Sequence, residues 1–243
     1  MKIICLPYAG GSASVFAKWN KYISPDIEII APELAGRGIR CSECFYSSIE
    51  EAAENIFEIV SEKCFDDKFA IFGHSMGCFI AYELYRRICE DSVLKNNLVH
   101  IFMSANYAPH LNNDEKHHTE HYKQGFDGIR KEVMRLGGTP VEIFDNPVFA
   151  GYFFPIINSD YKITETYQMN EFVQFSCGCT VLNGINDELS ADDLESWKQY
   201  SPHGFSVRNF PGSHFFINEH TEMVVSYINS VLKKHIRKEL IKI

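Results

Sequence analysis

Ser75 has the sequence neighbours that nucleophilic chemistry requires. It lies in Gly73-His74-Ser75-Met76-Gly77, which follows an apolar run and precedes a helical pattern. This G-x-S-x-G arrangement is typical of a nucleophile elbow, a sharp turn between a strand and a helix. The two glycines remove side chains where backbone segments approach closely, so that a strained turn can expose the hydroxyl. The alternative is a glycine-flanked serine in an ordinary turn.

A serine hydroxyl is a weak nucleophile, so it needs a base that is oriented by a third group. Asp187 and His214 each follow a predicted strand, and the order serine, acid, histidine is that of α/β-hydrolases. Several other residues compete for the roles of base and acid: His74, Asp160, Glu188, Asp192, Asp193, His203 and His220. We favour Asp187 and His214 because both fall at the sheet edge where Ser75 is expected. His74, adjacent to the serine on a tight turn, is expected to pack in the elbow or orient it.

Acyl transfer also needs backbone donors for the developing oxyanion. The elbow offers the N–H of Met76, at a helix N-terminus where free N–H groups and a positive dipole end are found. The small-residue loop Tyr8-Ala9-Gly10-Gly11 follows the first predicted strand, and we expect its Ala9 N–H to be the second donor. A simple turn is the alternative interpretation of this loop.

The elements that would hold these residues alternate between strand and helix in the first part of the chain. The predicted strands are Lys2–Leu6, Ile27–Ala31, Phe69–Phe72 and Leu98–Met103, followed later by Thr180–Gly184 and Phe205–Phe210. The predicted helices are Ser14–Tyr22, Ile49–Cys64, Met76–Cys89, Asp192–Tyr200 and a terminal helix from about Asn218 or Glu219. This alternation predicts the α/β class, with a mostly parallel sheet flanked by helices in a single domain over residues 1–243.

The alternation stops between about residues 109 and 175, which contain many aromatic residues but no clear strand. A segment of this length is too long for a connecting loop, so we interpret it as a helical cap, or lid, inserted before the last two strands. A cap over the carboxyl ends of the strands would supply apolar walls for a substrate. The alternative is that its aromatic residues build only the core of the cap.

Composition excludes several classes of protein. The formal net charge of −9 argues against nucleic-acid binding, which relies on clustered cations. No apolar stretch reaches the length of a membrane-spanning helix, and Pro7 and Gly10-Gly11 interrupt the initial apolar run before it could act as a signal peptide. The eight cysteines lack the spacing of a disulfide framework, so we expect reduced thiols in a cytoplasmic protein.

Two cysteine pairs and one histidine cluster contain residue types that can bind a metal ion. Cys41 and Cys44 form one C-x-x-C pair, whereas Cys177 and Cys179 form a distant C-x-C pair, which is not the spacing of a structural zinc site. The stretch His117–His121 lacks the glutamate that a zinc-protease helix needs, so we expect it to form a solvated face. No metal site is therefore predicted.

The motifs together resemble the type II thioesterases that accompany nonribosomal peptide and polyketide synthases, within the α/β-hydrolase superfamily. The resemblance rests on six segments along nearly the whole chain: Leu6–Ser12, Glu33–Gly38, Gly73–Gly77, Arg135–Pro140, Gly184–Asp187 and Gly212–Phe216. They are similar to the family's P-x-A-G-G opening, P-G-R-G loop, G-H-S-M-G elbow, cap signature, acid motif and histidine motif. Glu33-Leu34-Ala35 departs from the family pattern before Gly36. A generic hydrolase would share the elbow but not the cap signature.

This resemblance implies hydrolysis of acyl groups that are bound as thioesters to the phosphopantetheine arm of an acyl or peptidyl carrier protein. Ser75 would attack the carbonyl, His214 would act as base, and Asp187 would orient His214. No metal or nucleotide cofactor is implied, because the phosphopantetheine arrives with the substrate. The implied partners are carrier domains of a synthase, and we expect a monomer.

Carrier proteins are usually acidic, and this chain is acidic as well, so long-range attraction between them should be weak. We therefore expect docking to depend on local cations, and Arg37 and Arg40 are the candidates, because their loop follows a predicted strand end. Two alternative functions stay open: an acyl-coenzyme A thioesterase or carboxylesterase of primary metabolism, and a non-catalytic binding module of the same fold.

Overall fold

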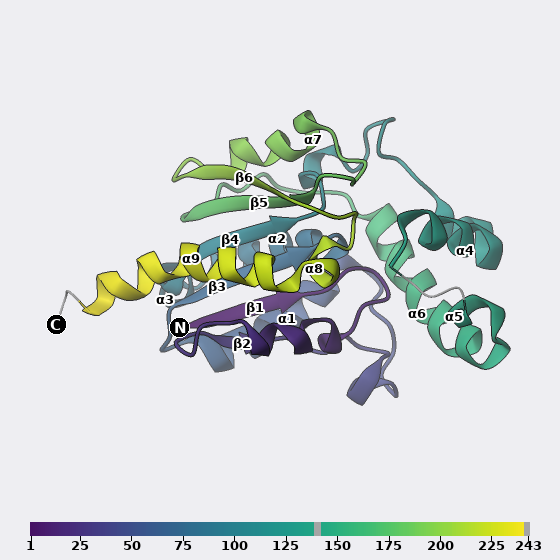
Figure 1. Ribbon diagram of the computed structural model, residues 1–243, viewed down its shortest axis with the longest axis horizontal. Helices are drawn as coiled ribbons and strands as arrows, with labels where there is room; N and C mark the ends of the chain where they lie inside the picture. The colour runs from purple at the N-terminus through teal and green to yellow at the C-terminus, as the bar shows by residue number, and fades with distance from the viewer. Residues whose placement is uncertain (139–141, 241–243) are drawn as a thin grey trace.

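The computed structural model describes residues 1–138 and 142–240, with side chains as far as residue 236 (Figure 1). Thr139 and Pro140 of the cap signature lie outside the described residues. The described chain contains one sheet of six parallel strands in the order β2-β1-β3-β4-β5-β6. The strands are β1 (Lys2–Leu6), β2 (Glu28–Ile30), β3 (Phe69–His74), β4 (Leu98–Ser104), β5 (Gly178–Gly184) and β6 (Phe205–Phe210). The predicted α/β class with a parallel sheet is confirmed.

The central strands are mainly apolar because both faces of the sheet are covered. All six residues of β3 are buried, whereas exposed and partly exposed residues alternate along the edge strand β6. β3 pairs with β1 so that Gly73 lies opposite Leu6, and it pairs with β4 so that His74 lies opposite Ser104. Because every strand runs in the same direction, the carboxyl ends of the strands form one edge of the sheet (Figure 1).

Helices cover both faces of the sheet and enclose two apolar cores. One face carries α1 (Ile49–Cys64), α2 (Met76–Ile88), α3 (Ser92–Asn97), α7 (Ala191–Glu195) and the 3-10 helix η5 (Ser196–Tyr200). The other carries the 3-10 helix η1 (Ala13–Lys21), α8 (Phe216–Glu219) and α9 (Thr221–Leu240). In α1 the apolar residues recur at helical spacing and are buried, and Ser48 caps its N-terminus by accepting a bond from the Glu51 N–H.

The segment between β4 and β5 forms a helical lid beyond the carboxyl edge of the sheet (Figure 1). Its described elements are η3 (Pro109–Leu111), η4 (His121–Gln124), α4 (Gly125–Leu136), α5 (Glu142–Asp145) and α6 (Pro147–Thr166). Ile129, Val133, Phe144 and Ile157 form the apolar core of the lid. The predicted helical insertion before the last two strands is confirmed, and its apolar residues form both this core and a cavity wall described below.

The observed elements differ from the predicted ones in detail. The first predicted helix is a 3-10 helix, and the helix predicted over Asp192–Tyr200 is divided into α7 and η5. The terminal helix is likewise divided, because His220 separates α8 from α9. A short 3-10 turn, η2 (Gly38–Arg40), lies in the loop after β2. Among the described residues, no helix combines the length and the apolar composition that crossing a membrane requires.

Candidate active site

Ser75 lies at the turn between β3 and α2 in a strained conformation. Its φ of 54° and ψ of −119° are unusual for a residue other than glycine. Its N–H donates to the Ser104 carbonyl at 2.8 Å, and its own carbonyl accepts bonds from the Cys78 N–H and the Asn106 side chain. These bonds hold the strained backbone between the end of β4 and the first turn of α2, as a nucleophile elbow requires.

The two glycines of the elbow leave no room for a side chain. A Cβ at Gly73 would lie 2.3 Å from the Gly77 carbonyl oxygen, and a Cβ at Gly77 would lie 2.3 Å from that of Leu6. Both obstacles are backbone atoms, which cannot rotate away. The expectation that these glycines permit close backbone approach is confirmed, and it accounts for their spacing around Ser75.

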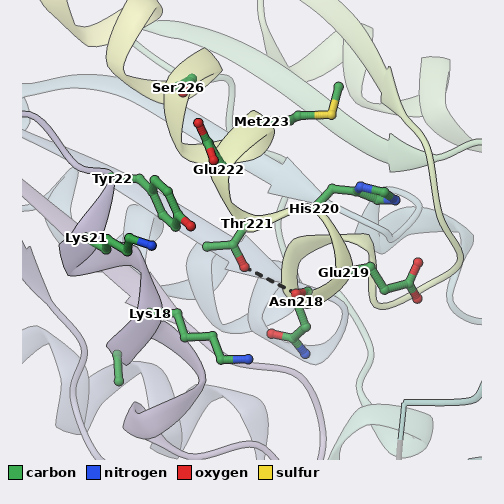
Figure 2. Close-up of a pocket in the computed structure, with 11 residues that line it drawn as sticks. Lys18, Lys21, Tyr22, Asn218, Glu219, His220, Thr221, Glu222, Met223 and Ser226 are labelled. Carbon is green, nitrogen blue, oxygen red and sulfur yellow. Dashed lines mark hydrogen bonds between the residues drawn. The ribbon is translucent and has the colours of Figure 1, made fainter.

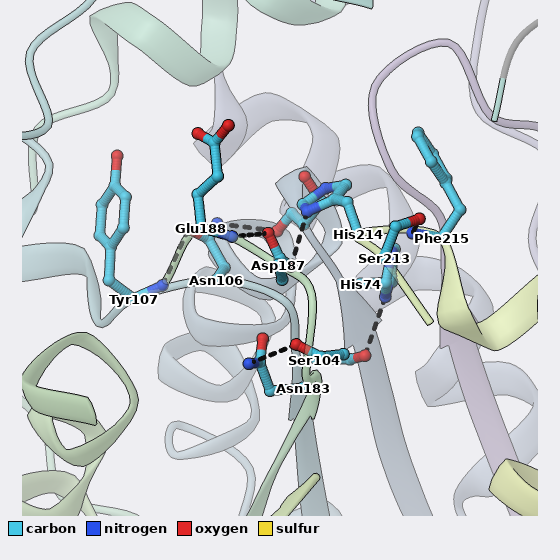
Figure 3. Close-up of polar contacts among 12 residues, drawn as sticks. His74, Ser104, Asn106, Tyr107, Asn183, Asp187, Glu188, Ser213, His214 and Phe215 are labelled. Atoms are coloured by element: carbon cyan, nitrogen blue, oxygen red, sulfur yellow. Dashed lines mark hydrogen bonds and ion pairs between the residues drawn. The ribbon is translucent and has the colours of Figure 1, made fainter. Parts of the chain in front are cut away.

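His214 and Asp187 are joined at the same edge of the sheet (Figure 3). His214 Nδ1 donates to Asp187 Oδ2 at 2.9 Å, and Asp187 Oδ1 accepts a bond from the Glu188 N–H at 2.8 Å. Each carboxylate oxygen therefore accepts a hydrogen bond, which fixes the carboxylate. Its bond to Nδ1 fixes the orientation of the imidazole and leaves Nε2 as the nitrogen that can accept a proton. In the described chain the Ser75 hydroxyl makes no hydrogen bond, while Ser75 and His214 line the same cavities.

The loops that carry Asp187 and His214 are tied to each other. The Asn186 N–H donates to the Gly212 carbonyl at 3.0 Å, and a Cβ at Gly184 would lie 2.2 Å from the Ser213 carbonyl oxygen. Glu219 accepts bonds from both the N–H and the hydroxyl of Ser213. The acid and the histidine are therefore positioned as one unit, although they are 27 positions apart in the sequence.

His74 is fully buried beside this unit, with Nδ1 2.8 Å from the Ser104 hydroxyl and its ring 5.4 Å from the His214 ring (Figure 3). Burial lowers the pKa of His74 well below its usual value, and the neighbouring His214 lowers it further. A permanently neutral imidazole packed under the elbow agrees with the packing role that the sequence predicted for it, rather than with the role of base.

The loop after β1 forms a turn over Tyr8–Gly11, closed by a bond of 2.9 Å from the Gly11 N–H to the Tyr8 carbonyl. Gly10 has a φ of +79° at the third position, which is where a type II turn requires glycine. Its neighbour Ala9 lines the same cavities as Ser75, and among the described residues the Ala9 N–H has no hydrogen-bond partner. Met76 lines the larger cavity as the first residue of α2. Ala9 and Met76 therefore both border the cavity that Ser75 lines.

Two cavities meet at Ser75, Ala9 and His214. The smaller, of about 180 Å³, has apolar walls that come mainly from the lid: Val133, Leu136, Ile143, Phe153, Ile157 and Phe215. The larger, of about 520 Å³, is lined by charged lid residues in addition to Asp187. A site with one apolar and one polar compartment could hold a short acyl chain on one side of Ser75 and a polar arm on the other.

The competing acids and histidines have other partners or positions. Glu188 points outward, with 69% of its side chain exposed, and pairs with Arg135. Asp193 forms a capping box with Ser190 at the start of α7. His203 lies exposed in a turn, and His220 lies between α8 and α9. The structure thus leaves Asp187 as the carboxylate that contacts His214.

Arg37 is wrong as a docking residue, because it is only 2% exposed. Its guanidinium donates to both carboxylate oxygens of Asp160, at 2.6 and 2.7 Å, and to the Gly11 carbonyl at 2.9 Å. Arg40 keeps 20% of its side chain exposed but pairs with Glu43. The P-G-R-G-like loop therefore supports the site from within, a role that spacing along the sequence could not reveal.

The prediction of a solvated face over His117–His121 is wrong for both terminal histidines. His117 stacks on Tyr107 with ring centroids 3.9 Å apart and contacts Asp193 at 3.1 Å. His121 Nδ1 lies 2.7 Å from a Glu165 carboxylate oxygen. His117 and His121 line the larger cavity, because this polar stretch folds back across α6 and α7.

Sequence reasoning missed the supporting role of two residues. Asn106, after β4, holds the elbow through the Ser75 carbonyl, and its own carbonyl accepts a bond from Trp197 at 2.9 Å. Asp160, in the lid, accepts bonds from Arg37 and from the Gly10 N–H. No local pattern distinguishes Asn106, and the sequence offers Asp160 only as a competing acid, because its contact with Arg37 spans 123 positions.

Another hollow, of about 850 Å³, lies away from Ser75, between η1 and the start of α9 (Figure 2). It is lined by residues such as Lys18, Lys21, Glu219 and Glu222, and it includes neither Ser75 nor Asp187 nor His214. Its size alone therefore does not make it the catalytic site.

Comparison with known proteins agrees with the geometry. The family model described as "Thioesterase domain" matches residues 1–232. The gramicidin S biosynthesis protein GrsT of Aneurinibacillus migulanus is 29% identical over 96% of this chain and 89% of its own length. ClbQ, from the colibactin NRPS/PKS pathway, superposes with a TM-score of 0.86 at 29% identity, covering 96% of this chain and 97% of its own. BorB, described as the type II thioesterase from the borrelidin biosynthetic cluster, gives 0.83 at 26% identity, covering 94% and 91%.

Proposed function

The chain belongs to the thioesterase domain family, and from this premise we propose that it is a type II thioesterase that releases aberrant acyl groups from carrier proteins. The acyl group would be bound as a thioester to the phosphopantetheine arm of a nonribosomal peptide or polyketide synthase. Membership of this family, which the motifs predicted, is confirmed by the family match and the named relatives. The observation that carries the proposal is the bond of 2.9 Å from His214 to Asp187, beside the strained Ser75 in a shared cavity.

The acylation step follows from these positions. Ser75 Oγ forms a bond to the thioester carbonyl carbon while His214 Nε2 takes the hydroxyl proton. Asp187 stabilises the imidazolium that results. The negative charge that develops on the carbonyl oxygen is stabilised by the N–H groups of Ala9 and Met76. The C–S bond then breaks, and the imidazolium gives its proton to the departing phosphopantetheine thiol.

Deacylation repeats the sequence with water as the nucleophile. His214 removes a proton from water, the resulting hydroxide attacks the acyl carbon, and the same backbone amides bind the oxyanion. The bond from Ser75 Oγ to the acyl carbon breaks, and Oγ regains the proton from His214. The products are a free carboxylic acid and an enzyme ready for another cycle.

The proposed function also implies a partner protein, an oligomeric state and a cellular compartment. A carrier domain would dock beside the P-G-R-G-like loop, with Arg40 as the remaining candidate cation because part of its side chain is exposed. A monomer would suffice, because one chain supplies Ser75, Asp187 and His214. All eight cysteines are unpaired, which supports a reducing compartment such as the cytoplasm.

The test is release of acetate from a carrier protein that is loaded with an acetyl-phosphopantetheine arm. We expect rapid release by the wild type and a loss of at least about 1,000-fold in Ser75→Ala, because the nucleophile is removed. Ser230→Ala is the matched control, since that serine lies exposed on α9 and its hydroxyl, among the described residues, bonds only the Tyr227 carbonyl. It should release acetate at the wild-type rate.

Free acetyl-coenzyme A and a simple acetyl ester are assayed in parallel. A preference for the carrier-bound acetyl group supports the editing function. Equal or faster turnover of the free substrates would move the function to an acyl-coenzyme A thioesterase or esterase of primary metabolism. If no substrate is turned over and a fluorophosphonate fails to label Ser75, the chain is a binding module.

A further inference from the structure

A buried ion pair joins the lid to the loop that carries Ala9. Asp160 of α6 and Arg37 are each 2% exposed, and the pair is bidentate, with N–O distances of 2.6 and 2.7 Å. The two residues are 123 positions apart in the sequence. Such a pair is costly to desolvate, so it contributes little net stability compared with an apolar pair of similar volume. Its position therefore calls for an explanation other than stability.

The Asp160 carboxylate also binds the turn over Tyr8–Gly11 directly. Asp160 Oδ2 accepts a bond of 2.7 Å from the Gly10 N–H, and Arg37 Nη1 donates to the Gly11 carbonyl at 2.9 Å. The turn is thus held at one N–H and one carbonyl, on consecutive residues that follow Ala9. A rotation of this turn would swing the Ala9 N–H away from the cavity.

The lid helix also limits the turn sterically. A Cβ at Gly10 would lie 2.7 Å from Ile157 Cγ1, one helical turn before Asp160 on α6. Ile157 at the same time forms part of the apolar cavity wall. The face of α6 that shapes the cavity is therefore the face that fixes the turn.

We propose that Asp160, together with Arg37, is a positioning residue that holds the Ala9 N–H at the oxyanion, so that the seating of α6 sets the competence of the site. This inference rests on the proposed function, because it assigns the Ala9 N–H to the oxyanion. Neither Asp160 nor Arg37 lines the two cavities at Ser75. Their effect is exerted through the turn, and it should be larger on the transition state than on substrate binding.

The first test measures Asp160→Asn. The amide keeps an oxygen that can accept the bond from the Gly10 N–H. Its NH₂ group faces the guanidinium, so the bidentate ion pair is lost and Arg37 is no longer fixed as the donor to the Gly11 carbonyl. We expect kcat for carrier-bound acetyl to fall about 10- to 100-fold, because a displacement of about 1 Å at a donor has effects of this size. KM should change less than about threefold.

Glu83→Gln is the matched control. Glu83 is also a buried acid, 3% exposed, which accepts bonds from Arg86 at 2.6 Å and from the Tyr167 hydroxyl at 2.5 Å. It lies on α2 and has no contact with the turn, so Glu83→Gln should keep the wild-type kcat even where its melting temperature falls.

A double variant, Arg37→Met with Asp160→Leu, separates positioning from stability. Replacing a buried ion pair by apolar residues commonly preserves the folded state. We expect a melting temperature near that of the wild type, with kcat still reduced, because the Gly10 N–H has lost its acceptor. If the double variant had both the melting temperature and the kcat of the wild type, the proposal would be overturned.

An acyl trifluoromethyl ketone gives a readout that does not depend on turnover. Ser75 Oγ adds to its carbonyl, the hydroxyl proton passes to His214, and the resulting oxyanion needs the same donors. Its inhibition constant should rise about 10- to 100-fold in Asp160→Asn and in the double variant, and should stay unchanged in Glu83→Gln. An unchanged constant in Asp160→Asn contradicts the positioning role. If the wild type binds the ketone but releases no acetate, the proposed function is contradicted instead. The inhibition constants alone then test whether Asp160 is a positioning residue.

Discussion

Gly77 shows how a single hydrogen atom in place of a side chain can determine a catalytic geometry. Its Cα faces β1 so closely that a Cβ would lie 2.3 Å from the Leu6 carbonyl oxygen and 2.9 Å from that of Pro7. These are backbone atoms of the strand that leads into the Ala9 loop. The start of α2 and the loop after β1 are therefore held at a fixed separation, and Met76 and Ala9 line the same cavity.

We predict that Gly77→Ala forces α2 away from β1. Overpacking of this kind costs about 1–3 kcal/mol of unfolding free energy. Displacing Ser75 should lower thioester hydrolysis roughly 100-fold. Chemical denaturation and acetate release measure the two effects.

Gly151→Ala is the control, because nothing lies within 4 Å of a Cβ at this exposed position in α6. An alanine within a helix should stabilise the protein by about 0.5–1 kcal/mol. If Gly77→Ala kept the stability and the acetate release seen in Gly151→Ala, the close backbone approach at the elbow would not be required for activity.

At the scale of elements, the packing of α9 against β4 makes stability sensitive to acid. His100 of β4 is nearly buried, its Nε2 lies 2.9 Å from the Thr180 hydroxyl of β5, and its ring faces His235 of α9. Burial lowers the pKa of His100 to about 3, and the charges of His235 and Lys234 act in the same direction. The folded state therefore keeps this imidazole neutral where the unfolded chain would protonate it.

The pKa values of His100 in the folded and unfolded states determine whether stability rises or falls with pH. In the unfolded chain His100 titrates near 6.5, so between about pH 6.5 and 3 the unfolded state binds the extra proton and stability falls as the pH falls. We predict that this group removes about 2 kcal/mol of unfolding free energy between pH 7 and pH 5. Urea denaturation of the wild type and of His100→Gln at both pH values measures this effect. Between pH 7 and pH 5 the variant should lose about 2 kcal/mol less unfolding free energy than the wild type. The same pH dependence in wild type and variant would contradict the prediction.

At the scale of the whole molecule, the two cores divide the cysteines into accessible and inaccessible groups. Cys41 and Cys44 are exposed, Cys89 is half-buried and the other five are buried. Burial raises the pKa of Cys78 and of Cys177 to about 12, so these thiols also lack the reactive thiolate form at neutral pH.

We predict that a disulfide reagent modifies two thiols rapidly in the folded protein and all eight after denaturation, because all eight are free. Titration with an aromatic disulfide, followed by absorbance, gives the counts. A Cys41→Ser, Cys44→Ser double variant should leave no fast-reacting thiol. Any fast thiol in that variant, or more than two in the wild type, would contradict the prediction.

The sequence by itself determined the features that short segments encode. Apolar runs and helical periodicity gave the parallel sheet and its flanking helices, because strand and helix patterns are local. The glycine spacing around Ser75 predicted the elbow, and the position of Asp187 and His214 after strands predicted their meeting, because parallel strands bring their carboxyl ends to one edge. The length of the segment before β5 predicted the lid.

Only the tertiary structure decided what each polar group contacts across the fold. Arg37 looked like an exposed loop cation, but the lid returns Asp160 against it, and the resulting pair holds the Ala9 turn. His117 and His121 looked solvated, but α6 and α7 supply Glu165 and Asp193 to them. Such partners lie far away in the sequence and leave no periodic signal. Their pairing is fixed by how the lid packs on the sheet edge, because a buried charge is tolerated only where a partner of opposite charge meets it.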